Sequence, residues 1–248
     1  MSVASEILKQ AVSSAGNVQA EYIIRAGNYI RSGADFFTPH PEEMLSGGII
    51  LKDSRSVVSG LDAQQRFFIK KYKKNGFWRT FKRALQYPRS WKCLAAALRL
   101  REIGIATPAV LFASRYCLVT EVLNPAQTVY LPVRPELAWD AVPLMARLHA
   151  AGIRHGDLNL RNICCLADGS LGLIDLDGSR LYRGAVPDNV RFLELARLTS
   201  SYLKCVHPEP EEMERITRKF AESYRACTGQ DFYSAALLAR VIELTGRR

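Results

Sequence analysis

The stretch HGDLNLRN (residues 155–162), followed by LIDLD (residues 173–177), decides the fold of this 248-residue chain. It places Asp157, Asn162 and Asp175 in polar loops that border apolar segments. A carboxylate can orient an attacking hydroxyl and accept its proton, and amide and carboxylate oxygens are hard ligands for Mg²⁺. Transfer of the γ-phosphoryl group of ATP requires these groups and little covalent work from the protein. We therefore expect Asp157 to act as the catalytic base, with Asn162 and Asp175 as magnesium ligands.

The spacing of these residues matches the kinase signature, in which H-R-D-L-x-x-x-N is followed by D-F-G. This chain has Gly156 in place of the arginine and Leu176-Asp177 in place of Phe-Gly. Each piece alone is a weak signal, because an Asp after two aliphatic residues commonly ends a strand or caps a turn. The three together favour a phosphotransferase over a polar loop between buried strands.

The order of the expected elements agrees with this interpretation. Strands with one helix among them precede residue 123, and mostly helices follow it. The expected strands are three short ones within 48–73, then 110–113 and 116–121, and the expected helices are 1–20, 90–104, 140–151, 188–204, 209–227 and 231–245. For helix 90–104, Ser90 is the expected N-cap. The pattern predicts an α+β, two-lobed protein-kinase-like fold, with a small antiparallel β-sheet lobe and one helix (1–123, including an N-terminal extension) and a helical catalytic lobe (124–248).

Two segments correspond to nucleotide-binding parts of such a fold. The third strand of a kinase carries a lysine that contacts the ATP phosphates, and Lys70 in FFIKKY (67–72) is the match. The neighbouring Lys71 points to the other side of the strand. A hinge is expected after residue 119, where the backbone of Glu121 and Leu123 would hydrogen-bond the adenine.

Two kinase parts are missing. The hairpin that should cover the phosphates has no glycine between Gly48 and Gly60, so the backbone and the side chains of its turn (54–56) would have to replace it. The helix that should pair a glutamate with the strand lysine has no acidic residue from Ala63 to Arg101, and Cys93 lies near the expected position. These departures keep a pseudokinase scaffold among the alternatives.

The acceptor side is also informative. No A-P-E motif follows Asp175, and Gly178 leads by residue 188 into a helix, so the platform on which a protein kinase binds peptides is absent from the sequence. This favours a small-molecule or glycan hydroxyl as acceptor. Arg161, in the catalytic loop, is well placed to help an anionic sugar or the γ-phosphate.

The net charge of +10 is concentrated between residues 66 and 92, where ten Lys or Arg and eight aromatic residues occur without one acid. A basic aromatic surface suits phosphates on a membrane face, on nucleic acid or on an anionic glycolipid. The chain has no apolar run long enough to span a membrane and no signal-peptide pattern at its start. Its six cysteines show no metal-binding spacing, which is typical of a reduced cytosolic protein.

The chain resembles the bacterial lipopolysaccharide core kinases, which phosphorylate heptose or Kdo in the inner core. The similar stretches are FFIKKY (67–72) with the basic run behind it, LRLREIGIATP (98–108), LHAAGIRHGD (148–157), HGDLNLRNI (155–163) and LIDLD (173–177). The resemblance implies Asp157 as base, Asn162 and Asp175 as metal ligands, and Lys70 on the ATP phosphates. It also implies a lipopolysaccharide-core acceptor at the cytoplasmic face of the inner membrane, with residues 66–92 on that surface, rather than a nucleic-acid partner.

Other readings remain open. A compact protein kinase and a small-molecule kinase share the HGD and IDLD motifs, although the basic run argues against a cationic acceptor, whose pocket would need acids. The sequence does not distinguish which sugar hydroxyl would be modified.

Overall fold

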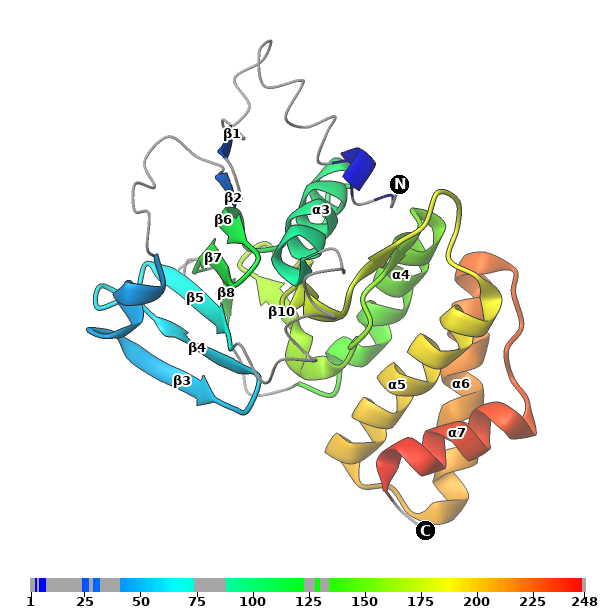
Figure 1. Ribbon diagram of the computed structural model, residues 1–248. Helices are drawn as coiled ribbons and strands as arrows, with labels where there is room; N and C mark the ends of the chain where they lie inside the picture. The colour runs from blue at the N-terminus through cyan, green and yellow to red at the C-terminus, as the bar shows by residue number, and fades with distance from the viewer. Residues whose placement is uncertain are drawn as a thin grey trace. The chain divides into compact units, whose positions relative to one another are not determined.

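The computed structural model describes residues 3, 5–7, 24–26, 29–31, 41–73, 88–122, 128–129 and 134–246. Figure 1 shows the arrangement of the elements within each of two compact units. Unit 1 comprises Met1–Arg99 and Thr107–Leu123, and unit 2 comprises Leu100–Ala106 and Asn124–Arg248. The predicted division into domains at residue 123 stays a prediction.

Unit 1 is built on an antiparallel sheet of seven strands, in the order β1-β2-β6-β7-β5-β4-β3. The strands are β1 (Ile24–Ala26), β2 (Tyr29–Arg31), β3 (Ile49–Asp53), β4 (Val57–Leu61), β5 (Phe67–Tyr72), β6 (Val110–Ser114) and β7 (Cys117–Glu121). The five strands expected from the sequence are therefore present, and the β1–β2 pair was missed.

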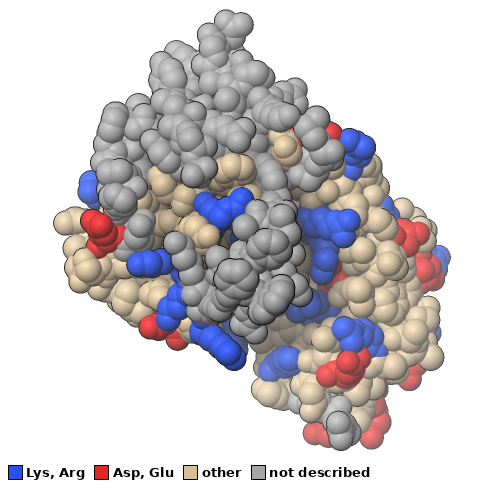
Figure 2. Space-filling view, viewed as in Figure 1, with Lys and Arg blue, Asp and Glu red and all other residues tan. Residues whose placement is uncertain are grey.

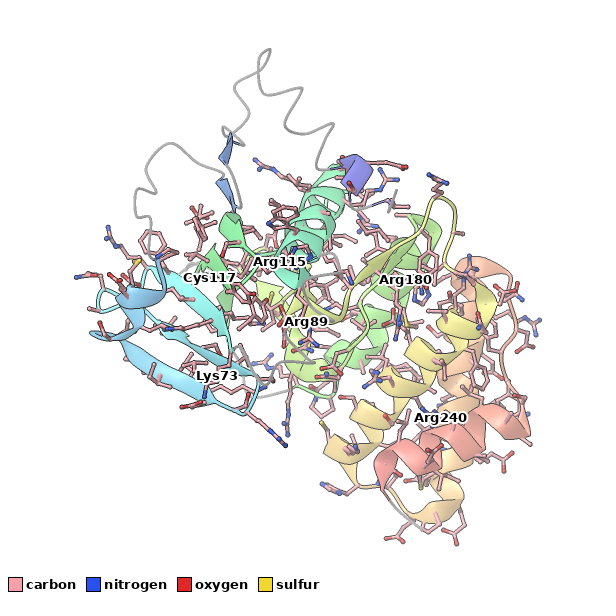
Figure 3. The ribbon with its side chains drawn as sticks, in the orientation of Figure 1. Lys73, Arg89, Arg115, Cys117, Arg180 and Arg240 are labelled. Atoms are coloured by element: carbon pink, nitrogen blue, oxygen red, sulfur yellow. The ribbon has the colours of Figure 1, made fainter. Side chains whose placement is uncertain are left out.

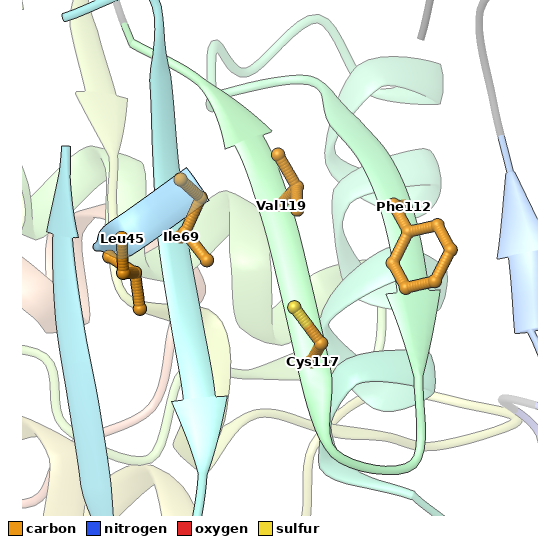
Figure 4. Close-up of a cluster of buried hydrophobic side chains, with 5 residues drawn as sticks. All are labelled: Leu45, Ile69, Phe112, Cys117 and Val119. Carbon is orange, nitrogen blue, oxygen red and sulfur yellow. The ribbon is translucent and has the colours of Figure 1, made fainter. Parts of the chain in front are cut away.

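A short 3₁₀ helix, η1 (Pro41–Leu45), packs on one face of this sheet. Leu45 packs there with Ile69, Phe112, Cys117 and Val119, as Figure 4 shows. Because side chains alternate along a strand, the burial of Ile69 on this face turns its neighbour Lys70 to the opposite face.

Helix α3 (Arg89–Glu102) lies between β5 and β6 in sequence, and Gly104 lies just past its end with φ +67°. The prediction of Ser90 as N-cap was wrong, because the helix already includes Arg89. The Ser90 hydroxyl donates instead to the carbonyl of Ser114, and the Trp91 Nε1 donates to the carbonyl of Ala113 at 3.0 Å. These bonds fasten α3 to the end of β6.

Unit 2 contains short strands and four longer helices. The strands and 3₁₀ turns are β8 (Thr128–Val129), β9 (Ile153–Arg154), η2 (Leu160–Asn162), β10 (Ile163–Leu166), β11 (Leu171–Leu173), η3 (Leu176–Gly178) and β12 (Arg180–Leu181). The helices are α4 (Leu137–Ala150), α5 (Asp188–Val206), α6 (Pro210–Thr228) and α7 (Ala235–Thr245). All four occur where the sequence predicted them, although α7 begins later, after Ser234, whose side chain accepts the N–H of Leu237 at 3.2 Å.

The helices of unit 2 pack against one another (Figure 1), and aromatic side chains join three of them. Trp139 of α4 stacks on Phe220 of α6 with ring centroids 4.4 Å apart, and Tyr202 of α5 packs against both. Helix α6 starts with Pro210 and ends before Gly229 at φ +74°, the residues that favour these two ends. These helices form the support on which the loops of unit 2 are held.

The predicted helix over residues 1–20 falls mostly outside the described residues, where only residues 3 and 5–7 are described, as helical.

Candidate active site

The predicted metal ligands are brought together by a β-hairpin in unit 2. Strands β10 and β11 pair so that Ile163 lies opposite Leu173, and the Ile174 N–H donates to the Asn162 carbonyl at 3.0 Å. Asp175 is the next residue after this pair. The hairpin therefore sets Asn162 and Asp175 at the same end of the ribbon, although thirteen positions separate them in the chain (175 − 162).

The side-chain orientation of Asn162 is fixed by the backbone of the predicted base. Its Nδ2 donates to the Asp157 carbonyl at 2.8 Å and more weakly to Asp157 Oδ2 at 3.3 Å. Because the amide nitrogen is used in this way, the Oδ1 atom is the group left to bind a cation. The sequence-predicted residues Asp157 and Asn162 are thus in direct contact.

Asp175 has left-handed backbone angles, φ 58° and ψ 62°. This conformation is uncommon for a residue with a side chain, and it is found most often for Asn and Asp, frequently at functional sites. It ends the strand and aims the chain into η3. The Asp175 carboxylate is exposed and has the hard oxygen atoms that Mg²⁺ prefers.

The donor set fits Mg²⁺. Within the described residues no group of three His, Cys, Asp or Glu side chains could hold a metal by itself. Mg²⁺ needs no such cage, because it is commonly held by one or two protein oxygens together with substrate phosphates and water. The amide of Asn162 and the carboxylate of Asp175 provide that number of ligands.

His155 ties the catalytic loop to the end of β11. Its Nε2 is 3.1 Å from the Ile174 carbonyl, and its Nδ1 accepts the Asp157 N–H at 3.3 Å. A nitrogen that accepts a hydrogen bond carries no proton, so the ring is the neutral tautomer with its proton on Nε2. Burial lowers the pKa of His155 below its ordinary value of 6.5, although Glu194 and the Ile174 carbonyl oppose the shift. The hydrogen bond accepted by Nδ1 and the lowered pKa both indicate that the His155 ring is neutral.

Helix α5 holds the start of this loop through a buried carboxylate. Glu194, only 2% exposed, accepts the Gly156 N–H at 2.6 Å through Oε1 and the His155 N–H at 3.1 Å through Oε2. His149 Nε2 lies 3.2 Å from Oε2, and His149 Nδ1 lies 2.8 Å from the Tyr224 hydroxyl. A charge buried at this depth needs such partners.

Burial, hydrogen bonds and neighbouring charges shift the pKa values of Glu194 and Tyr224 in this network. Burial alone would raise the pKa of Glu194, but the hydrogen bond and charge of His149 and the bond from the Gly156 N–H outweigh it, so the pKa lies below its ordinary 4.5. Burial raises the pKa of Tyr224 to about 12, so its hydroxyl keeps its proton at neutral pH. The network therefore presents an ionised Glu194 to the loop.

Further contacts run along the same face of α5. Arg197 forms an ion pair with Asp157, with 3.0 Å between the Arg197 nitrogen and Oδ1. One turn later, Ser201 accepts the Leu160 N–H at 3.0 Å. Residues three or four apart lie on one helix face, so this row of α5 sets the position of the loop residue by residue. Sequence reasoning missed Glu194 and Arg197; the available signal was a pair of charges in the apolar helix pattern LELARL.

Arg161 lies at the outer side of the loop. Its N–H donates to Asn159 Oδ1 at 3.0 Å, which caps η2. Its side chain is exposed and lies near Cys205, where its charge opposes the rise in the Cys205 thiol pKa that burial causes. The structure therefore leaves Arg161 accessible to a ligand, as its predicted role requires.

Gly156 replaces the arginine of the kinase signature for a local reason. Its φ is +89°, and a Cβ atom at this position would overlap the carbonyl oxygen of Gly178. The catalytic loop and η3 approach each other backbone to backbone at this point. Only glycine allows both the conformation and the close approach.

In unit 1, Lys70 lies on β5 opposite Ser59 of β4 and Leu118 of β7. It is 9% exposed, its ammonium is 5.7 Å from the ring centroid of Phe68, and Lys71 is exposed on the other face. The register thus supports the choice of Lys70 over Lys71 for the inward lysine.

The predicted hinge is described only at its start. Glu121 ends β7, and its N–H donates to the Ala109 carbonyl at 2.9 Å, so an adenine contact at this residue would use the carbonyl oxygen of Glu121. Leu123 lies outside the described residues. Helix α3 has no acidic residue before the exposed Glu102 at its end, and Cys93 is buried.

The hairpin that replaces the glycine-rich loop closes on itself. The Ser54 hydroxyl donates to the Val57 carbonyl at 3.0 Å and accepts the Val57 N–H at 3.2 Å. Ser54, one of the turn residues (54–56) predicted to contact the phosphates, is therefore engaged in the turn itself. Exposed Arg55 lies beside it at the tip.

The basic aromatic run is described in part, because residues 74–87 lie outside the described residues. Figure 2 shows Lys and Arg, together with some acidic residues, on this part of the surface. Strands β3 and β5 carry exposed Lys52 and Lys71, and exposed Arg55 and Arg66 lie in the connections beside them. In the described part of the chain, no helix has the length and apolar character needed to cross a bilayer.

Comparison with known proteins places the chain. The model of the lipopolysaccharide kinase (Kdo/WaaP) family matches residues 51–224. The comparison with curated proteins gave no match.

Two solved structures that resemble the chain are both kinases. One is the ROP18 kinase domain in complex with AMP-PNP and sucrose, at 15% identity and a TM-score of 0.43, covering 98% of this chain and 90% of that one. The other is the bifunctional kinase-methyltransferase WbdD, at 15% identity and a TM-score of 0.45, covering 90% of this chain and 54% of that one. Likeness at this level adds no argument about function. The family match over most of the chain, together with the α+β kinase-like fold of its two units, shows that the chain belongs to the lipopolysaccharide kinase (Kdo/WaaP) family and is a kinase.

Proposed function

We propose that this kinase transfers the γ-phosphoryl group of ATP, with Mg²⁺, to a sugar hydroxyl of the lipopolysaccharide inner core. The observation that carries the proposal is the hairpin geometry, in which the bond from the Ile174 N–H to the Asn162 carbonyl sets Asn162 beside Asp175, while Asn162 contacts Asp157. A base and two oxygen ligands at one ribbon end are the protein groups that phosphoryl transfer needs.

The residues have distinct roles in this proposal. Asn162 Oδ1 and the Asp175 carboxylate hold Mg²⁺, which supplies charge neutralisation on the phosphate oxygens. Lys70 contacts the phosphates, and the backbone of Glu121 and Leu123 contacts the adenine. Asp157 orients the acceptor hydroxyl.

The contacts of Asp157 indicate which of its oxygens accepts the proton. Oδ1 is held by Arg197 at 3.0 Å, whereas among the described residues Oδ2 receives the longer contact from Asn162 at 3.3 Å. The acceptor oxygen forms a bond to the γ-phosphorus as its proton passes to Oδ2. The bond from the γ-phosphorus to the β–γ bridging oxygen breaks, and its electron pair leaves with ADP.

A glycan acceptor is supported by the family and by the short segment after η3. This segment is bonded back onto the end of α4, through the Tyr182 N–H to the Gly152 carbonyl and the Val186 N–H to the His149 carbonyl, both at 2.8 Å. It carries no long activation loop on which a peptide would bind. Arg161, exposed in the catalytic loop, would contact an anionic sugar or the γ-phosphate.

We place this reaction at the cytoplasmic face of the inner membrane, where the basic aromatic run (66–92) would contact the membrane surface or the anionic glycolipid. The exposed basic side chains of unit 1, among them Lys71 and Arg66 of this run, support this placement, because basic residues attract an anionic bilayer.

The test is transfer of labelled γ-phosphate from ATP to underphosphorylated lipopolysaccharide core, with and without Mg²⁺. The native chain is compared with Asp157→Asn and with the matched control Asp140→Asn, which changes an exposed carboxylate of α4. We expect Mg²⁺-dependent labelling of the glycan by the native chain and the control, and none by Asp157→Asn. ATP binding without labelling of glycan or protein would instead support a pseudokinase scaffold, and labelling of protein alone would support a protein kinase.

A further inference from the structure

The two-stranded ribbon next to the catalytic loop pairs two like charges. Strands β9 and β12 are antiparallel, and Arg180 lies directly opposite Arg154. Side chains in such positions are neighbours, with Cβ atoms about 5 Å apart, and like charges there are destabilising. Within the described residues neither arginine has an ion pair with an acid. The fold thus brings two positive charges together without neutralising them.

Arg154 also has an unsatisfied donor. Its Nε atom is buried and has no hydrogen-bond partner among the described residues. Such groups are rare because leaving a buried donor without a partner costs free energy, and a bound ion or water is the usual explanation. A buried guanidinium nitrogen beside a second guanidinium calls for an anion.

An aromatic ring completes the same face. Tyr182 follows Arg180 by two residues, which puts both side chains on one side of the extended chain. The Arg180 guanidinium carbon lies 5.0 Å from the centroid of the Tyr182 ring. Figure 3 shows Arg180 on the segment that leads into α5. The forked guanidinium group of arginine matches the geometry of carboxylate and phosphate groups. The amphipathic ring of tyrosine can pack on the apolar face of a sugar.

The ribbon is held in place before any ligand binds. The hydrogen bonds from the Tyr182 N–H and the Val186 N–H fix it to the end of α4. Gly152, at φ +73°, allows the two segments to touch, since a Cβ there would overlap the carbonyl oxygens of Tyr182 and Gly184. A pre-organised site loses less entropy when it binds.

The ribbon is also close to the chemistry. Arg154 precedes Asp157 by only three residues, so their Cα atoms are at most about 11 Å apart. A group bound by Arg154 would therefore belong to the acceptor near its reacting hydroxyl.

We propose that Arg154, Arg180 and Tyr182 form a subsite for a carboxylate or phosphate group of the acceptor glycan. The proposal rests on the proposed function, because it assigns the acceptor side of that reaction. It explains why the fold keeps two opposed arginines beside the catalytic loop.

The first test measures stability in the absence of ligand. If the arginines repel each other, Arg154→Gln and Arg180→Gln should each raise the melting temperature by about 1–4 °C, and the double variant should gain no more than one of them. The matched control is Arg215→Gln on α6, which removes an exposed arginine that is paired with Glu212. Lower melting temperatures for both single variants would show that the arginines are structural and would overturn the proposal.

The second test uses the delipidated, underphosphorylated core oligosaccharide, in which the target hydroxyl is free, and measures its binding by calorimetry without ATP and then transfer with ATP. Four acceptors are compared: the intact oligosaccharide, its dephosphorylated form, its carboxyl-reduced form and the form with both treatments. We expect the native chain to prefer the intact acceptor, and each Arg→Gln variant to weaken its binding about ten- to a hundredfold. Arg154→Lys should recover part of the loss, because it keeps the charge without the fork. The treatment that abolishes the native preference identifies the anion as phosphate or carboxylate.

The outcomes separate the two proposals. Arginine-dependent binding without transfer would support the subsite and contradict the glycan kinase. Transfer in which the double variant keeps the native preference for the intact acceptor would support the kinase and overturn the subsite. Binding of the oligosaccharide that none of the variants changes would also overturn it.

Discussion

The Glu194 carboxylate and the backbone N–H of Gly156 are joined by a hydrogen bond of 2.6 Å that links helix α5 to the catalytic loop. The other oxygen of the same carboxylate accepts the His155 N–H at 3.1 Å. Two successive amides of the loop are therefore held by one buried side chain, and the next residue in the chain is the proposed base, Asp157. The position of the base depends on a residue far away in sequence.

Glu194→Gln is expected to destabilise the protein although it keeps the size of the side chain. Both carboxylate oxygens accept hydrogen bonds, and the glutamine amide group would place a donor against one of the donors. We expect a loss of about 3 kcal/mol in the free energy of unfolding, measured by urea titration. Glu243→Gln, at an exposed pair with Arg240, is the control and should change little. Equal stability of the two variants would contradict the role assigned to Glu194.

Gly156→Ala is expected to be more harmful than the same change at another glycine with a similar backbone. Gly169 has φ +82° and open space around its Cα, so Gly169→Ala should cost about 1–2 kcal/mol for the conformation alone. At Gly156 the added methyl also overlaps the Gly178 carbonyl, and we expect about 3–5 kcal/mol. Thermal or urea unfolding of the two variants provides the comparison. Equal losses would mean that the backbone contact between Gly156 and Gly178 has no energetic weight.

Arg197→Ala is expected to slow transfer by misplacing the base. Arg197 bonds Asp157 Oδ1, and small displacements of a catalytic group can reduce the rate about a hundredfold. We expect kcat to fall with little change in the KM for ATP. Because Arg197 acts through Asp157, the double variant Asp157→Asn/Arg197→Ala should be no slower than Asp157→Asn alone. Additive losses would show instead that Arg197 contacts a substrate directly. Arg197→Lys should retain part of the rate.

Acidification is expected to weaken the fold in two steps. The folded-state pKa of His155 lies below 6.5, so the unfolded chain binds a proton more readily, and the stability contributed by neutral His155 is lost as the pH falls below 6.5. The pKa of Glu194 lies below 4.5, so its contribution is lost as the pH falls below 4.5.

The free energy of unfolding, measured from pH 7.5 down to well below pH 4.5 so that both steps are covered, tests this. One proton gives a slope of at most about 1.4 kcal/mol per pH unit. His155→Gln should reduce the slope just below pH 6.5, while leaving the Glu194 step in place. If the His155→Gln variant keeps the full slope of the native chain, His155 is not the source of that slope.

The relation between sequence and structure differs between the local and distant parts of the site. The contact of Asn162 with Asp157 and the hairpin that returns Asp175 depend on residues close in the chain. The spacing predicted the roles of these three residues, whereas the contact and the hairpin were not predicted. The lysine strand followed from its alternation, which distinguishes Lys70 from Lys71. These parts are local, and local physics determines them.

Other parts depend on how distant segments meet. Glu194 and Arg197 belong to a helix whose pattern looks amphipathic, and their contacts with the loop exist only once α5 packs against it. The opposition of Arg154 and Arg180 depends on the register of a two-residue ribbon. The N-cap assigned to Ser90 was wrong because the helix begins one residue earlier, at Arg89, and the Ser90 hydroxyl instead donates to the carbonyl of Ser114 on a later strand.

The most direct measurement of the central claim is phosphorus NMR of underphosphorylated lipopolysaccharide core after incubation with the native chain and Mg-ATP. We expect a new phosphomonoester signal on a sugar hydroxyl. This signal should be absent when Asp157→Asn replaces the native chain. A native sample that consumes no ATP and gives no new phosphomonoester, although it binds Mg-ATP, would contradict the proposed function.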